Sequence, residues 1–245
     1  MKKDRNASTL SAVAVIPAAG KGHRMGGRDY KQFLEINGKP ILTLTLEKFQ
    51  ACPSIQAIIV IVPSHQVETC QRKVITPYSI KKVQKVLAGG ERRQDSVRLG
   101  IESSGGKYDL VVIHDGVRPF VAPQLVENMV SLAKEHRALT AGIPAKDTIK
   151  EVGEDGLVRR THNREGLWMV QTPQVFHYQD ILEAHHEALR KEWGDVTDDA
   201  QMVERMGIPV KVIEGSEMNI KVTTPGDLAL ARYLLKAPEG SEGRI

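Results

Sequence analysis

Residues 12–32 constrain the fold of this chain more than any other stretch. An apolar run of alanine, valine and isoleucine, Ala12–Ile16, stops at Pro17 and is followed by a segment rich in glycine and cations that reaches Gln32. A short apolar run bounded by turn residues is typical of a buried strand. Open α/β sheets bind their ligands in the crevice at the carboxyl ends of their strands. The stretch therefore predicts an α/β protein with a ligand site directly after its first strand.

Short apolar strands alternate with amphipathic helices as far as Pro144, and helices resume later in the chain. The further expected strands are Ile55–Val62, Val83–Ala88, Leu110–Asp115, Leu139–Ile143 and Val210–Glu214, with a short extended segment at Ile220–Thr223. The expected helices are Ile41–Phe49, Val67–Val74, Asp95–Ser103, Pro123–Arg137, Tyr178–Glu192, Asp198–Met206 and one that starts at Pro225. Strands separated by helices of this length predict a mostly parallel sheet and hence a three-layer α/β/α sandwich of the Rossmann-like kind.

The alternation lapses after Pro144. Two β-capable runs, Thr148–Val152 and Leu157–Arg160, flank a turn with an Asp-Gly pair at residues 155–156, which is a hairpin signal. Because this hairpin has little apolar surface to bury, we expect it to project from the sheet as an arm at about residues 147–168. We expect residues 1–236 to form a single domain and the polar residues 237–245 to be a disordered tail.

Composition limits the classes of function. The chain has 34 lysines and arginines against 30 acidic residues, and a net charge of +4 is too small for a surface that coats nucleic acid, despite a pI of about 9.0. Cys52 and Cys70 lack the spacing of a metal site or a disulfide framework, which favours a reduced, cytoplasmic setting. No stretch approaches the ~20 apolar residues of a membrane span. We therefore expect neither a nucleic-acid nor a membrane partner.

The charged N-terminus followed by residues 12–16 has some likeness to a signal peptide. The apolar run is short, however, and polar residues interrupt the approach to it. Removing it would also deprive the glycine-rich loop of its strand. We therefore read this run as a strand of the folded protein.

The loop Gly20-Lys21-Gly22-His23-Arg24-Met25 is the first candidate site. It has neither the Gly-Lys-Ser/Thr of a Walker A loop nor the glycine spacing of a dinucleotide fingerprint. Its glycines let the backbone approach a triphosphate, while Lys21, Arg24 and the later Lys31 supply charge where pyrophosphate would leave. By composition alone, a surface turn with incidental cations is an equally open interpretation.

Two further segments follow expected strands. Asp115 ends a strand and is a natural Mg²⁺ ligand, because magnesium is usually held by one or two carboxylates together with substrate phosphates. The alternative is an Asp that caps a helix or a turn. Arg118 could clamp a phosphate or cover the sheet edge. Gly89-Gly90, followed by Ser96 at a helix start, could read a base edge or form an ordinary capped helix entry.

Other common catalytic arrangements are missing from the sequence. The segment His185-His186-Glu187 lacks the second histidine of a His-Glu-x-x-His zinc site, so we expect a solvated helix face there. No Ser/His/Asp order or Cys/His pair indicates covalent catalysis. Glycines, cations and one well-placed carboxylate instead favour a phosphoryl-type transfer, which depends on positioning and charge neutralisation.

Several blocks together resemble the 2-C-methyl-D-erythritol 4-phosphate cytidylyltransferase family, in the family's order over residues 12 to about 235. The first are Pro17–Met25 with Lys31-Gln32, Gly89–Arg92 with Asp95-Ser96, and His114–Pro119. The later ones are Pro144–Lys150, Arg164 with Leu167-Trp168, Thr172–Gln174, Thr197–Ala200 and Asn219–Thr223.

The resemblance implies a reaction of CTP with methylerythritol phosphate that releases pyrophosphate in the non-mevalonate route to isoprenoids. The residues expected to contact CTP are Ala18, Ala19, Gly20, Lys21, Gly22, Arg24, Lys31, Gly89, Gly90, Glu91, Ser96 and Asp115. Those expected to contact the sugar phosphate are Asp115, Arg118, Thr148, Arg164, Thr172 and Lys221. Those expected to be catalytic are Arg24, Lys31, Arg164 and Lys221, with Asp115 as the ligand of Mg²⁺ or another divalent cation.

The resemblance also implies a homodimer in which the arm lends Thr148 and Arg164 to the neighbouring site. Three positions depart from the family pattern: Tyr30 replaces a proline, Glu91 replaces a common aspartate, and Met218 stands where some members carry a carboxylate. Two alternatives differ in their sequence signals. A ribitol-5-phosphate cytidylyltransferase lacks the Arg-x-Gly-Leu-Trp pattern seen here. A non-catalytic nucleotide-binding module would be expected to lose Lys31 or Asp115.

Overall fold

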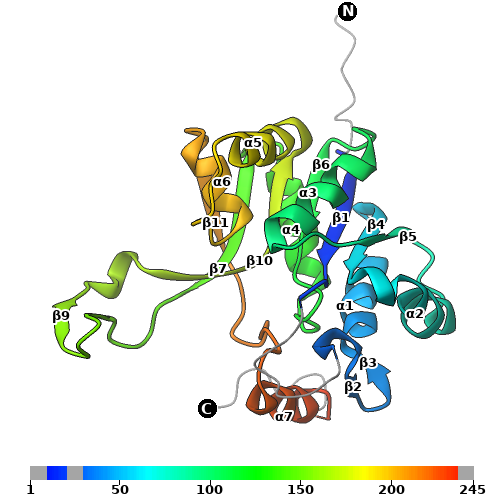
Figure 1. The fold of residues 1–245 in the computed structure, drawn as a ribbon, viewed down its shortest axis with the longest axis horizontal. Helices are drawn as coiled ribbons and strands as arrows, with labels where there is room; N and C mark the ends of the chain where they lie inside the picture. The colour runs from blue at the N-terminus through cyan, green and yellow to red at the C-terminus, as the bar shows by residue number, and fades with distance from the viewer. Residues whose placement is uncertain (1–9, 21–29, 237–245) are drawn as a thin grey trace, which may run out of the picture.

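A computed structural model of the chain describes residues 10–20 and 30–236. Within these residues a seven-stranded sheet has the strand order β11-β7-β10-β6-β1-β4-β5 (Figure 1). The strands are β1 (Ala12–Pro17), β4 (Ile55–Val62), β5 (Val83–Ala88), β6 (Leu110–Ile113), β7 (Ala138–Pro144), β10 (Trp168–His177) and β11 (Val210–Glu214). All neighbouring pairs are parallel except those that β10 makes with β6 and β7, so the mostly parallel sheet is confirmed.

Burial on both faces explains why β1 and β6 read as unbroken apolar runs. In β1, Val15 pairs with Ile59 of β4 on one side and with Ile113 of β6 on the other, and all three side chains are buried. A parallel sheet has helices on both faces, so successive side chains of a strand all meet apolar partners. Polar residues first occur where these strands end, at the carboxyl edge of the sheet.

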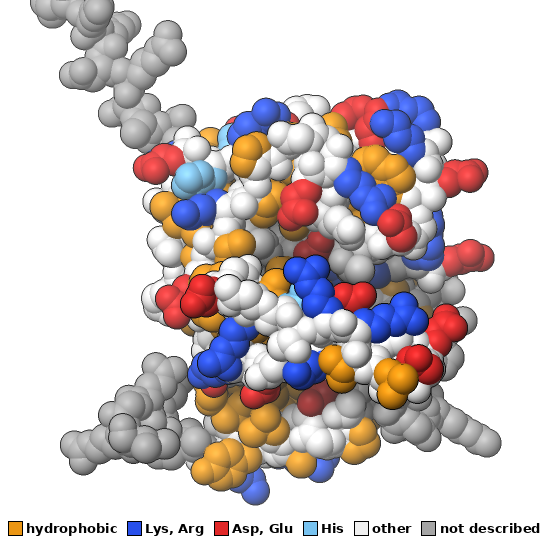
Figure 2. Space-filling model, turned by 90° about the vertical axis from the view of Figure 1, so that its left-hand side faces the viewer, with side chains coloured by type: hydrophobic (Ala, Val, Ile, Leu, Met, Phe, Trp, Pro, Cys, Tyr) orange, Lys and Arg blue, Asp and Glu red, His pale blue; other side chains and the backbone are white. Residues whose placement is uncertain are grey.

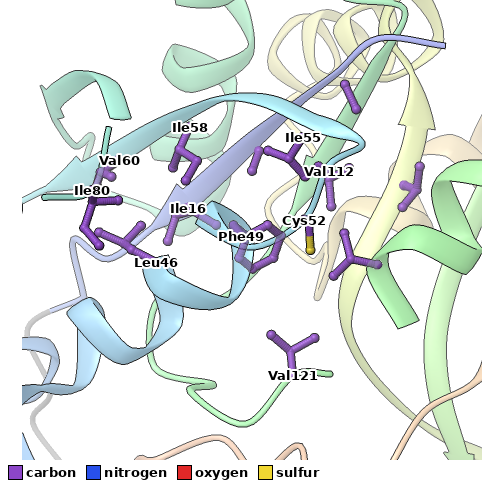
Figure 3. Close-up of a cluster of buried hydrophobic side chains, with 14 of the residues drawn as sticks. Ile16, Leu46, Phe49, Cys52, Ile55, Ile58, Val60, Ile80, Val112 and Val121 are labelled. Atoms are coloured by element: carbon purple, nitrogen blue, oxygen red, sulfur yellow. The ribbon is translucent and has the colours of Figure 1, made fainter. Parts of the chain in front are cut away.

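Helices cover both faces and make the three layers expected. On one face, α1 (Ile41–Gln50), α2 (Val67–Cys70) and α4 (Pro123–Leu132) pack against the strands, and Figure 3 shows Leu46 and Phe49 beside Ile16 and Ile58. On the other face, α3 (Arg93–Ser104), α5 (Tyr178–Arg190) and α6 (Asp199–Arg205) pack against the alternate side chains of the same strands.

A third, smaller cluster closes the carboxyl edge of the sheet. The short strands β2 (Glu35–Ile36) and β3 (Lys39–Pro40) form a hairpin that lies beside α7 (Pro225–Leu234) (Figure 1). The hairpin turns at an Asn-Gly pair in which both residues have positive φ, 52° and 77°. Asn-Gly favours this turn, but the sequence interpretation above did not include the hairpin.

Strand β10 overturns one expectation, because the sequence pattern predicts no strand between the arm and Tyr178. Its segment Gln171–Phe176 is buried although it contains polar residues and a proline. The amide of Gln174 donates to Thr140 Oγ1 at 2.9 Å and to Asp198 Oδ2 at 2.7 Å. These partners lie far away in the sequence, so local hydrophobic periodicity could not reveal the strand.

Several expected boundaries also shift. The expected helix Val67–Val74 is α-helical only to Cys70 and continues as a π-helical turn over Gln71–Ile75. The helix that starts at Pro123 ends at Leu132, five residues before the expected end. The hairpin arm is confirmed, with β8 (Lys150–Val152) paired to β9 (Val158–Thr161), and it projects to one side of the sheet (Figure 1).

The structure also bears on the cysteines, on membrane-spanning helices and on the C-terminal tail. Cys52 and Cys70 are both buried free thiols, as expected from their spacing. Within the described part of the chain, none of the helices has the length and apolar character required to cross a bilayer. The expected tail at residues 237–245 lies outside the described residues.

Candidate active site

One cavity of about 810 Å³ opens at the carboxyl edge of the sheet, next to the ends of β1, β5 and β6. It brings together all of the described residues that we expected to contact CTP. Its lining residues are Pro17, Ala18, Ala19, Gly20, Lys31, Gln32, Gly89, Gly90, Glu91, Arg92, Arg93, Ser96, Asp115, Val117 and Lys221. The expected residues Lys21, Gly22 and Arg24 lie outside the described residues.

The end of β1 forms the first wall of the cavity and places Lys31 there. Ala18 N–H donates to Ile61 O at 2.7 Å, which keeps the chain beside β4 after the strand ends. The buried amide of Gln32 donates to Ala18 O at 2.5 Å. This contact ties the short helical turn Lys31–Phe33 to the strand end, so Lys31 lines the cavity.

The second wall is the connection from β5 to α3, where two glycines allow close backbone approach. A Cβ on Gly89 would lie 2.5 Å from Ala19 Cβ and 2.8 Å from Ser96 Oγ, and one on Gly90 would lie 2.5 Å from Asp95 Cβ. Gly90 N–H donates to Ser96 Oγ at 3.2 Å. The first turn of α3 is therefore packed directly against the end of β1.

Asp115 lies on the floor of the cavity, directly after β6, and three cationic side chains surround it. Arg93 Nε is 3.3 Å from its Oδ1, while Arg118 Nε and Lys221 Nζ are 3.4 Å and 2.9 Å from its Oδ2. Arg118 also donates to Asn219 O at 2.8 Å, which links the group to the segment before α7. The cluster thus joins three segments that are distant in sequence.

The protonation state of Asp115 follows from these neighbours. Burial on its own raises the pKa of a carboxyl, but the charges of Arg93, Lys221 and Arg118 outweigh burial and hold the pKa of Asp115 far below its ordinary value. Asp115 is therefore an anion near neutral pH, and it can serve as a metal ligand or as an anchor for cations.

Behind Asp115, His114 is fully buried, and burial lowers its pKa to about 4, so it is neutral near pH 7. Its Nε2 lies 3.1 Å from Arg118 O, which can only accept, so Nε2 carries the proton. The Thr172 hydroxyl then donates to Nδ1 and accepts from Asp115 N–H, both at 3.1 Å. Thr172 is expected to bind substrate, but it is buried here as a support for Asp115.

An irregularity in β10 puts Thr172 in this place. Val170 pairs with Gly142 and Gln174 pairs with Thr140, so β10 has more residues than β7 between the two pairs. A bulge of this kind aims side chains away from the regular ladder. Here Gln171 accepts from Asn219 Nδ2 at 3.2 Å, and Asn219 also donates to Thr172 O at 2.8 Å.

A buried network that sequence reasoning missed lies on the other side of Asp115. Arg93 donates from a second nitrogen to Asp199 Oδ2 at 2.6 Å, and His185 Nε2 lies 3.1 Å from Asp199 Oδ1. Asp199 and His185 are 0% and 2% exposed. Burial raises the pKa of Asp199, but the charges of Arg93 and the imidazole of His185 hold it below its ordinary value.

The expectation that His185 belongs to a solvated helix face is wrong, although its neighbour His186 is exposed. Tyr178, Ile181, Ala184 and Ala188 are the other buried residues of α5, and His185 falls on the same helical stripe. The spacing therefore contained a signal for its burial. Nothing local indicated Asp199 as its partner.

The residues expected on the arm lie away from the cavity. Thr148 and Arg164 are exposed and do not line the cavity in the described part of the chain. Arg164 donates to Lys146 O across the base of the arm. Figure 2, which faces the side from which the arm projects, shows Lys and Arg side chains across the middle of that face, interspersed with acidic ones.

Asp115 is the one cavity-lining carboxylate besides Glu91 in the described residues. No group of three or more His, Cys, Asp or Glu suited to a metal is present in the described ranges. Magnesium needs no such group, because it keeps several waters and is held by one or two carboxylates plus substrate phosphates. Near Met218, the carboxylate of Glu217 pairs with Lys146 instead. Asp115 thus fits a magnesium ion that enters with a triphosphate.

The chain matches one family of known proteins over almost its whole length. A sequence model of the family described as "IspD: 2-C-methyl-D-erythritol 4-phosphate cytidylyltransferase" matches residues 12–237. A 2-C-methyl-D-erythritol 4-phosphate cytidylyltransferase from Syntrophus aciditrophicus is 44% identical over 228 residues, which cover 93% of this chain and 97% of that protein.

Solved structures are similar as well. The 4-diphosphocytidyl-2C-methyl-D-erythritol synthase from Anaerococcus prevotii is 30% identical with a TM-score of 0.82, over 94% of this chain and 97% of that one. The 2-C-methyl-D-erythritol 4-phosphate cytidylyltransferase from Thermus thermophilus is 32% identical with a TM-score of 0.74, over 94% of this chain and 100% of that one. With the cavity and its Asp115 cluster, these matches establish that the chain belongs to the 2-C-methyl-D-erythritol 4-phosphate cytidylyltransferase family.

Proposed function

We propose that this chain transfers the cytidylyl group of CTP to 2-C-methyl-D-erythritol 4-phosphate, giving 4-diphosphocytidyl-2-C-methyl-D-erythritol and pyrophosphate. The observation that carries the proposal is the single cavity in which Lys31, the glycines before α3, Asp115 and Lys221 meet. The family match and the named relatives support this substrate pair over ribitol 5-phosphate.

CTP would lie along the wall formed by β1 and the start of α3. Gly90, Glu91 and Ser96 would recognise cytosine and ribose, since all three line the cavity and offer backbone groups and a hydroxyl there. The triphosphate would extend toward Lys31, whose charge would neutralise the α-phosphate as negative charge develops there. Arg24, on the loop outside the described residues, would act on the same phosphate.

The sugar phosphate would enter beside Lys221 and Arg118. One of its phosphate oxygens would attack the α-phosphorus in line, forming a new P–O bond while the bond to the bridging oxygen of pyrophosphate breaks. The attacking phosphate is already anionic near neutral pH, so no protein base is needed. The side chains of the cavity would bind, orient and neutralise rather than form a covalent intermediate.

Magnesium is part of this proposal. Asp115 would hold the ion together with phosphate oxygens and water, and the bound ion would offset the negative charge of the departing pyrophosphate. Lys221 and Arg118 pair with Asp115 in the ligand-free arrangement. These two side chains would then pair with the phosphates when substrates arrive.

We further propose a homodimer in which the arm of one subunit contributes Thr148 and Arg164 to the site of the other. Apolar side chains along the arm support an interface, since Val152, Leu157 and Val158 are 53%, 67% and 57% exposed. Large apolar side chains clustered on a surface commonly mark an interaction site. At the base of the arm, Trp168 and Met169 are also exposed.

Pyrophosphate release from CTP tests the reaction, with methylerythritol phosphate and ribitol 5-phosphate offered separately. We expect release with the first substrate only, abolished by EDTA and restored by Mg²⁺. Release with ribitol 5-phosphate alone would overturn the assignment.

Mixing K31A subunits with R164A subunits tests the shared site, because one site of a mixed dimer would contain both native residues. Recovery of activity on mixing supports the exchange of arms, and its absence in a dimer shown by sedimentation contradicts it. The cytoplasmic location stays a prediction from the cysteine content.

A further inference from the structure

Arg93 spans two carboxylates of different kinds. On one side it bonds Asp115, which lines the cavity, and on the other it bonds Asp199, which is fully buried at the start of α6. A guanidinium carries several donors in a rigid planar fork, so it can hold two carboxylates at once in a defined geometry. Lysine, with one nitrogen on a flexible chain, cannot do so.

The two oxygens of Asp115 have different partners. Oδ2 is bonded by Arg118 and Lys221, the cations that we expect to turn toward phosphates when substrates bind. Oδ1 is bonded by Arg93. If Arg118 and Lys221 release the carboxylate during the reaction, Arg93 is the partner that keeps its orientation.

Arg93 itself needs support to hold that position. Its side chain is 31% exposed at the cavity wall, where an incoming triphosphate would attract it. Asp199 opposes this attraction from the interior, and His185 of α5 in turn holds the second oxygen of Asp199. A buried carboxylate with two partners is a rigid anchor.

We propose that Asp199, held by His185, is a positioning residue for the cytidylyl transfer: it clamps Arg93 so that Arg93 fixes the orientation of Asp115. The inference rests on the proposed function and deepens it. Neither Asp199 nor His185 lines the cavity, so neither touches the reacting atoms.

The charges distinguish this role from a purely structural ion pair. Three cations, Arg93, Arg118 and Lys221, pair with the two carboxylates of the cluster. The cluster therefore has one net positive charge when the His185 imidazole is not counted. Replacing Asp199 by Asn adds one more positive charge and frees Arg93 to turn toward the triphosphate. CTP should then bind as tightly as before or more tightly, while transfer becomes slow because Asp115 is misoriented.

Kinetics of D199N, with CTP binding measured by calorimetry, test the proposal. We expect kcat to fall about 10- to 100-fold, as for loss of groups that orient a metal or substrate ligand. We expect the Kd of CTP to stay the same or to fall by up to about tenfold. An unchanged kcat, or a parallel loss of kcat and CTP affinity, would overturn the proposal.

D198N is the matched control, because it removes a charge from the neighbouring residue. Asp198 caps α6 through Gln201 N and bonds Gln174 rather than Arg93. Asn keeps the oxygen that caps α6 but loses the acceptor for the Gln174 amide, so D198N should lower stability. Because Asp198 does not bond Arg93, we expect kcat to stay within about twofold of the wild type. A loss of kcat in D198N equal to that in D199N would mean that α6 acts only through its packing.

If D199N does not fold, the variant R93K tests whether Arg93 must bond both carboxylates. The lysine keeps the charge but has one nitrogen in place of the two that bond Asp115 and Asp199, so it cannot hold both in the same geometry. We therefore expect the same fall in kcat with CTP affinity retained. In the double variant R93K/D199N, kcat should equal that of R93K within about twofold, because both changes break one interaction. Wild-type turnover in R93K would refute the clamp. Failure of the wild-type enzyme itself to release pyrophosphate would instead refute the proposed function.

Discussion

The close contact at Gly89 makes a sharp prediction about CTP binding. In G89A the new methyl carbon would lie 2.5 Å from Ala19 Cβ, 2.8 Å from Ser96 Oγ and 3.3 Å from Ile61 Cγ2. Carbon atoms in contact prefer about 3.5–4.0 Å, so the start of α3 and the end of β1 must separate by about 1 Å. Both of these walls of the cavity would move.

This displacement has two measurable costs. Overpacking of a tight site lowers the free energy of unfolding by about 1–3 kcal/mol, which urea denaturation measures. A shift of about 1 Å in a binding site can lower catalytic efficiency about 100-fold, so we expect kcat/KM for CTP to fall by roughly that factor. Calorimetry with CTP should show the same loss in the absence of the second substrate.

Two other glycine variants separate the effects. In G100A the methyl group would lie 2.6 Å from Val15 Cγ1, in the core beneath the middle of α3, so we expect a similar loss of stability with CTP affinity nearly kept. In G194A the nearest atom is 3.9 Å away, and neither quantity should fall. If G89A binds CTP within about twofold of the wild type while losing stability like G100A, the steric account of the nucleotide wall is wrong.

Three further predictions address other parts of the molecule. K31A should lower kcat about 10²–10³-fold while changing CTP affinity far less, because its charge matters most as the transition state forms; steady-state kinetics and calorimetry test this, and equal losses would exclude the role. R164A should raise the KM for methylerythritol phosphate about 10- to 100-fold and leave CTP binding intact; a titration showing weaker CTP binding would contradict the assignment. Burial raises the pKa of both Cys52 and Cys70 to about 12, so the thiols stay protonated at pH 8 and should react with iodoacetamide only after unfolding; mass spectrometry of the native protein checks this, and rapid labelling would show that these sites open.

Local patterns predict the parts of the fold whose burial is local. Ile55–Val62 is a β-branched run because helices cover both of its faces, and the structure has a strand with the same bounds. Strand β10 shows no such pattern. The amide of its buried Gln174 donates hydrogen bonds to partners that are 34 and 24 residues away in the sequence. Polar residues in a central strand look like loop residues until those partners are known.

Some residues of the candidate site could likewise be predicted from local sequence, and others could not. Gly89, Gly90 and Asp115 could be predicted because each directly follows an apolar strand, where chain geometry places it at the carboxyl edge of the sheet. The clamp of Arg93 by Asp199 joins residues 106 positions apart, so no spacing rule indicates it. Predicting it requires knowing that α6 lies against the start of α3.

The bulge in β10 has a consequence for anyone who wishes to redesign this protein. The tip of the arm, residues 154–156, is exposed and lies far from the sheet, so a change in its length leaves the surroundings of Asp115 intact. A single residue inserted between Trp168 and Gln171 is different. A one-residue slip turns every later side chain of a strand to the opposite face, so Thr172 would face away from Asp115. Evolution can therefore vary the length of the arm at its tip but not at its root.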